Sequence, residues 1–222
     1  MNYILLFLAV VVGYLTALLL KTKEMRQMSI YLAFSGAFLL ALTIFELLPE
    51  VYESPSKNTS IYIMAGILLQ IFLEFFSKGA EHGHVHLHSE KRDYPWLLFI
   101  SLSVHALLEG FPISEANNLL IGVIVHKVPI VVILSMFFIK AEYSKSTILM
   151  FLTLFGLMTP IGSWVSVHFS EVQDYKTEIN ALVIGIFLHV STTILFESSK
   201  DHKFNLVKLI TILVAISLAY LL

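Results

Sequence analysis

Apolar residues fill long, nearly unbroken runs along the chain, and short polar segments separate the runs. A helix needs about 20 apolar residues to cross a hydrocarbon core of roughly 30 Å, and these runs are of that order. They are continuous rather than alternating, which excludes a transmembrane β-barrel. We therefore predict an all-α bundle of eight transmembrane helices, at about 3–20, 29–48, 60–77, 95–114, 118–139, 146–169, 180–197 and 204–222.

Composition supports a membrane protein, because 57% of the 222 residues are hydrophobic and only 14% are charged. The connecting segments are short, so we expect one transmembrane domain over residues 1–222 and no separate soluble domain. The net charge of −2 says little about partners. No cysteine is present, so a metal site must use His, carboxylate, amide, Met or backbone ligands.

Lysine and arginine are unevenly divided between the two sets of alternating loops. The loops after the first, third, fifth and seventh predicted helices hold ten, whereas those after the second, fourth and sixth hold two. The positive-inside rule then places both termini outside the cytoplasm and the histidine-rich loop 78–94 inside it. We expect a multi-pass protein of the cell membrane, in particular a bacterial inner membrane.

Ionisable residues interrupt the apolar pattern in the two central helices. His105 and Glu109 are four residues apart in SVHALLEGFPI, so they project from one helix face and can reach one ion. His126 follows in VIVHKVPIVVIL. Intramembrane ionisable groups are costly and usually functional, although a structural His–Glu hydrogen bond is the alternative. Pro112 and Pro129 are each expected to remove a helical hydrogen bond, which frees a carbonyl for an ion or leaves a kink.

Two internal similarities indicate repeats. HALLEG aligns with HKVPIV, which matches His105 with His126, and a GxFL start is shared by the helices at 29–48 and 180–197. These are the second and seventh of the eight predicted helices, so they flank the central pair symmetrically. Because they are an odd number of helices apart in the chain, they are expected to cross the membrane in opposite directions. Inverted repeats with interrupted helices at the midplane are typical of secondary transporters.

These motifs resemble the ZIP family of divalent-metal transporters. The resemblance rests on HxxxEG at His105, HKxP at His126, ELLPE from Glu46, the histidine-rich loop and the eight-helix length. It implies a 3+2+3 helix arrangement with both termini outside, and movement of Zn²⁺, Fe²⁺, Mn²⁺ or a similar cation into the cytoplasm. The chain departs from the family where an Asn and a Glu are common, because Ala106 and Ile130 stand there.

Lys127 occupies a position where the family can have a ligand for a second metal, and a cation would repel that metal. We therefore predict one transported ion, held by His105, Glu109 and His126, with Lys127, Pro129 and Pro112 tuning the site. The fourth ligand is water, a carbonyl, or a residue of a flanking helix, for which His189 and Glu46 are the candidates. His189 is otherwise a hydrogen-bonded helix contact, and Glu46 a solvated residue near a helix end.

Two imidazoles and a carboxylate suit Zn²⁺, Fe²⁺, Mn²⁺, Co²⁺ or Cd²⁺ and disfavour Ca²⁺ and Mg²⁺. The loop EHGHVHLHSE adds a lower-ranked candidate site, with alternating histidines that receive or sense metal or merely bind it adventitiously. Gln70 and Glu74, one turn apart, either lead towards this loop or serve packing. The loop histidines are His82, His84, His86 and His88.

Transport of a divalent metal is the preferred function, with zinc first and with iron, manganese or cadmium as further substrates. An intramembrane metalloenzyme is the runner-up, although HxxxE lacks the adjacent general base of HExxH. A receptor-like bundle that binds metal without moving it is the third hypothesis. We expect no enzyme activity, no cofactor apart from the transported ion and no nucleic-acid ligand. The partners are the metal ion and the lipid bilayer, and the sequence leaves a homodimer open.

Overall fold

The computed structural model describes residues 3–20, 25–77, 94–114, 117–197 and 206–222. Within these ranges the regular structure is entirely helical, which confirms the predicted all-α class. One long helix, α2–η2–α3, includes a π-helical turn, and α8 is a single short turn of helix. The elements are α1 Tyr3–Leu19, α2 Met25–Leu42, η2 Thr43–Leu47, α3 Leu48–Glu53, α4 Thr59–Ser77, α5 Trp96–Gly110, α6 Leu119–Lys140, α7 Lys145–His168, α8 Ser170–Gln173, α9 Lys176–Glu197 and α10 Leu206–Leu221.

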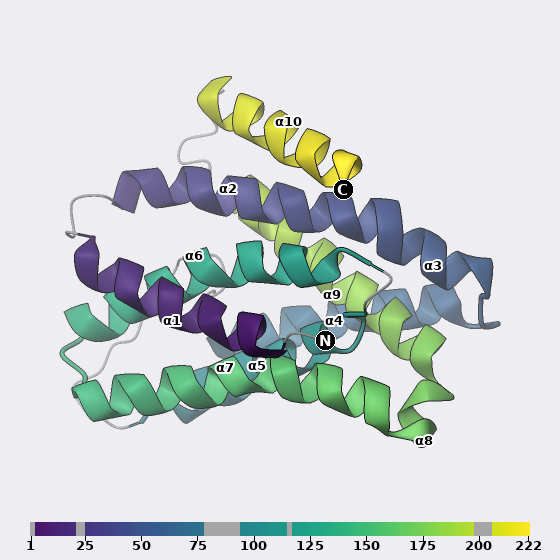
Figure 1. Ribbon diagram of the computed structural model, residues 1–222, viewed down its shortest axis with the longest axis horizontal. Coiled ribbons are helices and arrows are strands. Elements are labelled where there is room, and N and C mark those ends of the chain that lie inside the picture. Colours follow the sequence, from purple (N-terminus) through teal and green to yellow (C-terminus); the bar gives the residue numbers. More distant parts are fainter. Residues whose placement is uncertain (1–2, 21–24, 78–93, 115–116, 198–205) are drawn as a thin grey trace.

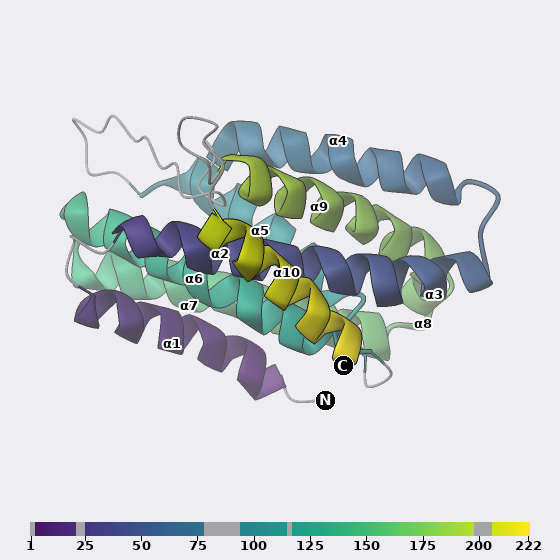
Figure 2. The same ribbon diagram turned by 90° about the horizontal axis from the view of Figure 1, so that it is seen from above.

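Most of the helices run along the long axis of the molecule, and α10 lies on the outside against α2 (Figure 1). Two groups can be distinguished by their packing: α1, α5, α6 and α7 pack mainly on one another, and α4 and α9 form another extensive contact beside α2. Contacts of α2 with α6 and of α4 with α5 join the groups. Helices α1, α4, α6 and α9 all end towards the same end of the bundle (Figure 2). This alternation is the up-and-down course expected of successive spans.

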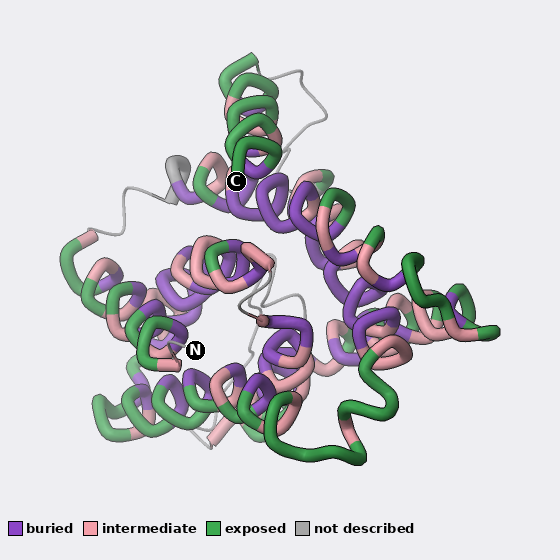
Figure 3. The backbone as a smooth tube through the Cα atoms, turned by 45° about the vertical axis from the view of Figure 1, so that its right-hand side comes forward, coloured by how far each residue is buried: buried purple, intermediate pink, exposed green. Residues whose placement is uncertain are grey.

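Within the described ranges, five helices are long and apolar enough to cross a membrane, and α1, α5 and α10 are shorter apolar helices. Residues on the outer surfaces, such as most of those along α10, are exposed, whereas buried residues gather where helices face one another (Figure 3). An apolar exterior around a helical bundle is what lipid requires. The structure therefore fits a helical membrane protein, and eight spans with inverted repeats stay a prediction.

Two predicted boundaries differ clearly from the structure. The helix expected at 95–114 ends at Gly110, and Pro112 lies beyond it, so the expectation that Pro112 removes a hydrogen bond inside that helix is wrong. Glycine disfavours continuation of a helix and a proline two residues later cannot extend it. In contrast, the helix expected at 29–48 continues to Glu53. Its π-helical turn, in which the N–H of Leu48 donates to the carbonyl of Thr43, precedes Pro49 and shifts the hydrogen-bond register there.

Glycines allow α5 and α7 to approach closely beside the central polar residues. A Cβ atom added to Gly162 would collide with the carbonyl oxygen of Leu107, and one added to Gly110 would collide with that of Thr159. Small residues at such crossings let helix backbones meet in membranes. The close approach brings Thr159 of α7 next to Glu109 of α5.

Candidate metal-transport site

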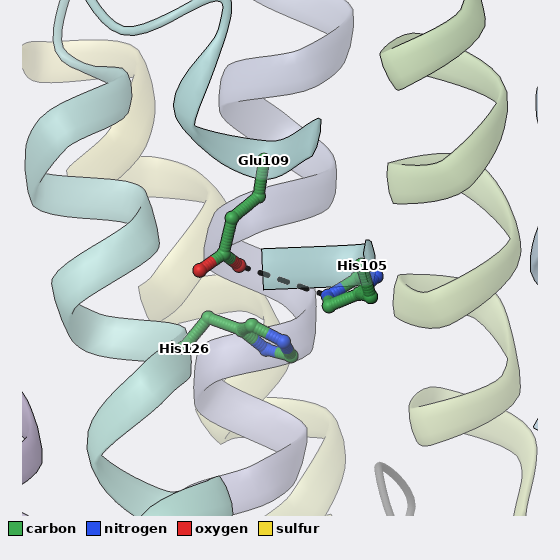
Figure 4. A group of neighbouring side chains, drawn as sticks. All are labelled: His105, Glu109 and His126. Carbon is green, nitrogen blue, oxygen red and sulfur yellow. Dashed lines mark ion pairs between the residues drawn. The ribbon is translucent and has the colours of Figure 1, made fainter. Parts of the chain in front are cut away.

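Three ionisable residues meet between α5 and α6. His105 and Glu109 lie one turn apart on α5, His126 lies on α6, and each has one potential ligand atom within 4.8 Å of those of the others. All three are almost fully buried, with exposed fractions of 4%, 1% and 3%. Figure 4 shows their side chains turned towards one another, with His105 Nε2 at 3.7 Å from Glu109 Oε2. The structure thus brings together the three residues that the sequence singled out as ligands.

The two carboxylate oxygens of Glu109 have different surroundings. Oε1 accepts hydrogen bonds from the Lys127 ammonium and, at 2.6 Å, from the Thr159 hydroxyl. Lys127 also donates to the Thr159 hydroxyl at 2.7 Å, and its ammonium lies 4.8 Å from the centre of the Phe155 ring. Oε2 is the oxygen that faces the His105 ring. Lys127 and Thr159 therefore hold one side of the carboxylate and leave the other side turned to the histidine.

Gln70 of α4 fixes the orientation of the His105 ring. Its side-chain oxygen lies 3.0 Å from His105 Nδ1, and Gln70 itself is fully buried. Because an amide oxygen only accepts hydrogen bonds, Nδ1 carries the proton in this arrangement. In a neutral ring, Nε2 then has its lone pair on the side of Glu109. Histidine ligands of metals are commonly oriented by such a second hydrogen bond.

The other two candidate ligands, Glu46 and His189, lie elsewhere. Glu46 accepts from the backbone N–H of Asn118 at 2.8 Å and from the Asn118 side chain at 2.9 Å, so it caps the start of α6. His189 of α9 contacts Glu74 of α4, with 2.6 Å between Nε2 and Oε2. Among the described His, Asp and Glu side chains, those grouped closely enough to hold one ion at the centre are thus the three of α5 and α6.

The residues expected to tune the site lie in different parts of the structure. Lys127 lies directly against Glu109. Pro129 is inside α6, and it lines an apolar pocket between α1, α2 and α6 rather than the polar centre. The Pro112 carbonyl accepts a hydrogen bond from the Asn117 side chain at 2.9 Å, in the segment that joins α5 to α6. The loop histidines His82, His84, His86 and His88 lie outside the described residues.

Sequence reasoning missed Thr159 and left the role of Gln70 open. Thr159 precedes a proline in the apolar run LMTPIGS, and Gln70 interrupts ILLQIFL. The signal available for both was a polar side chain within an apolar helix. Such a signal does not reveal the partner, because the partner lies on a different helix.

Comparisons with known proteins point to one family. The family model of the ZIP zinc transporters matches residues 80–222, which contain α5 to α10. The zebrafish (Danio rerio) protein named Zinc transporter ZIP1 is 24% identical over 135 residues, which is 56% of this chain and 43% of that protein. The protein of the same name from Takifugu rubripes is 25% identical over 131 residues, again 56% of this chain and 43% of that protein.

A third relative, Protein zntD of Dictyostelium discoideum, is 27% identical over 150 residues, which is 58% of this chain and 22% of that protein. The chain therefore spans less than half the length of these relatives. The matched region includes His105, Glu109 and His126 on the helices that the structure brings together. On the strength of the family match over well more than half of its length, the chain belongs to the ZIP zinc transporter family.

Proposed function

We propose that this protein moves divalent transition-metal ions across the cell membrane into the cytoplasm, and that His105, Glu109 and His126 bind the ion on its way. The observation that carries the proposal is the burial of these three ligand atoms within 4.8 Å of one another, between two helices of a ZIP family member. A carboxylate and two imidazoles inside an apolar bundle are costly unless they serve a cation or another charge. Membership of a transporter family also argues against the metalloenzyme hypothesis.

The ligand set favours zinc among the substrates and also suits iron, manganese and cadmium. Imidazole nitrogen and one carboxylate oxygen are common zinc ligands, whereas calcium and magnesium need shells of oxygen. Three protein ligands leave a fourth position open to water or a carbonyl. An incomplete protein shell suits a carrier, because a substrate has to leave as well as bind.

The charges at the centre support one transported ion rather than two. Lys127 supplies a buried positive charge beside Glu109, where a second divalent ion would need negative ligands. Ala106 and Ile130 are buried apolar residues, and neither offers a ligand atom. The ammonium therefore takes the place that a second metal would have, and it neutralises Glu109 when the site is empty.

For the arrangement in the membrane, we propose a single transmembrane domain with eight spans and both termini outside the cytoplasm. The common direction of α1, α4, α6 and α9 supports this proposal, because these helices end where the lysine-rich connections follow in the sequence (Figure 2). The positive-inside rule assigns that end to the cytoplasm.

Uptake into proteoliposomes tests the function. The purified protein is reconstituted, and the entry of Zn²⁺, Fe²⁺, Mn²⁺ and Cd²⁺ is measured for the unaltered chain, for Glu109→Gln and for empty vesicles. We expect saturable uptake that falls to the empty-vesicle level in Glu109→Gln, because a neutral amide is a poor ligand for these ions. Glu171→Gln, at an exposed position of α8, is the matched control and should keep full uptake.

The outcomes separate the competing hypotheses. Uptake that survives Glu109→Gln would overturn the assignment of the site. Metal bound at the centre without uptake of any of the four ions would instead favour the receptor-like bundle.

A further inference from the structure

A second pair of metal-ligating side chains lies one helical turn beyond the central group. His105 contacts Gln70 on α4, and Glu74 is the next residue along the same face of that helix. Glu74 Oε2 lies 2.6 Å from Nε2 of His189 on α9. Polar side chains thus continue from Glu109 through His105 and Gln70 to this pair.

Exposure increases along this chain of side chains. Glu109, His105 and Gln70 are nearly or fully buried, whereas the side chains of Glu74 and His189 are 22% and 19% exposed. Glu74 is also nearer than Gln70 to Ser77, the last residue of α4. Four residues of helix advance by about 6 Å, so the pair lies roughly one turn closer to that end of the bundle. The centre is enclosed by protein, whereas the pair is partly exposed, which leaves room for further ligands to complete a coordination shell.

The chemistry of the pair matches the ions that suit the centre. It offers one imidazole nitrogen and one carboxylate oxygen, both of which bind zinc at about 2.0 Å. In a tetrahedral shell two such ligands lie roughly 3.3 Å apart, so the pair has to open by only about 0.7 Å from its present spacing. Both side chains are long, and small rotations provide that opening.

We propose that Glu74 and His189 form a second binding station for the transported transition metal, which the ion occupies after it leaves His105, Glu109 and His126. This inference rests on the proposed function for its direction, but the binding of metal at the pair does not depend on transport. Gln70 separates the two stations and contacts His105 of the first. The competing explanation is a hydrogen bond that only joins α4 to α9, whose backbones already approach closely at Gly66 and Gly185.

Metal stoichiometry tests the second station directly. The full-length protein is purified with the loop histidines 82, 84, 86 and 88 changed to asparagine, so that the loop does not contribute. Zinc bound per chain is then measured by elemental analysis after dialysis against buffered free Zn²⁺. We expect two ions per chain, and one after Glu74→Gln, which keeps a hydrogen-bonding side chain next to His189. His189→Asn should have the same effect, and Glu109→Gln should remove the other ion.

His168→Asn serves as the matched control, because His168 is an exposed histidine at the end of α7 and should leave both ions in place. Overturning the inference requires one ion per chain before any change at Glu74, or two ions that persist in both Glu74→Gln and His189→Asn. If the pair is only a hydrogen bond between α4 and α9, Glu74→Gln and His189→Asn should leave the number of bound ions unchanged and lower the thermal stability.

Uptake measured on the same variants separates this inference from the proposed function. If the protein takes up Zn²⁺ but binds a single ion per chain, the proposed transport function stands and the second station is refuted. If the chain binds two ions but takes up none, metal binding at Glu74 and His189 stands and the proposed transport function is refuted. If both hold, Glu74→Gln should slow Zn²⁺ uptake while the ion at the centre stays bound.

Discussion

Changing Gln70 to leucine removes the hydrogen-bond acceptor of the His105 ring at little change in side-chain size. In a neutral His105 ring, the Nδ1–H points to the Gln70 oxygen, 3.0 Å away, and Nε2 is the atom left to bind an ion. Leucine leaves the Nδ1–H without this acceptor in a buried position. The ring then loses the contact that fixes both its orientation and its tautomer, and Nε2 is no longer held ready for an ion.

The expected size of the effect follows from these contacts. Loss of the group that orients a histidine ligand weakens metal binding by about 10- to 100-fold, which corresponds to about 1.4–2.7 kcal/mol. A buried donor left without a partner also lowers the free energy of unfolding of the metal-free protein by about 1–3 kcal/mol. Both losses arise from one hydrogen bond, so they should appear together.

Competition with a chromophoric chelator measures the Kd for Zn²⁺ in detergent, on the chain without loop histidines. Gln70→Glu restores an acceptor and should bring the affinity back, whereas Gln70→Leu should not. The reasoning would be refuted if Gln70→Leu bound Zn²⁺ as tightly as the unaltered chain. It would also fail if Gln70→Glu and Gln70→Leu were equally weak, because the acceptor would then be irrelevant.

Three further predictions follow from contacts around the centre. Lys127→Met leaves the Glu109 carboxylate buried without its ammonium, so the free energy of unfolding of the metal-free protein should fall by about 3–5 kcal/mol, and Zn²⁺ should stabilise this variant more than it stabilises the unaltered chain. Chemical unfolding with and without Zn²⁺ measures both effects, and an equal loss in the exposed Lys140→Met would contradict the prediction. Glu46→Ala removes the cap of α6 and should cost about 1 kcal/mol in the same assay; a weakened Kd for Zn²⁺ would show instead that this carboxylate is a ligand. Gly162→Leu forces α7 away from α5 and should abolish Zn²⁺ uptake while the protein still inserts in the membrane; native uptake would show that the close crossing is not needed.

The sequence predicted most of the helices because each depends on a local apolar run, and local hydrophobicity is what lipid selects. It also predicted that His105, Glu109 and His126 lie close together, as they do in the structure, since His105 and Glu109 share a helix face and the central helices were expected to meet. That they bind a metal ion stays a prediction. The sequence decided less where other helices set the outcome, because it left open whether Glu46 and His189 bind the ion or make other contacts. The partner of Glu46 is Asn118, and the partner of His189 is Glu74. Neither pairing is visible from the spacing of residues in one segment.

Helix ends show the same limit. The end of α5 at Gly110 follows local chemistry, and the proline two residues later was the available signal. The continuation of α2 past Pro49 depends on a π-helical turn, which has no simple signature in residue type. A proline therefore indicates an interruption of the hydrogen-bond pattern but not its form.

The ion pair between Lys127 and Glu109 also bears on how a carrier resets after it delivers its cargo. With neutral histidines, the charges of the empty centre cancel, so returning it across the bilayer moves no net charge at the site. The loaded centre instead carries the full charge of the divalent ion through a medium of low dielectric constant. For the proposed carrier, a membrane potential that is negative inside would thus drive the loaded step and leave the empty return almost unaffected. Metal entry would be electrogenic without any need for a second ion to travel back.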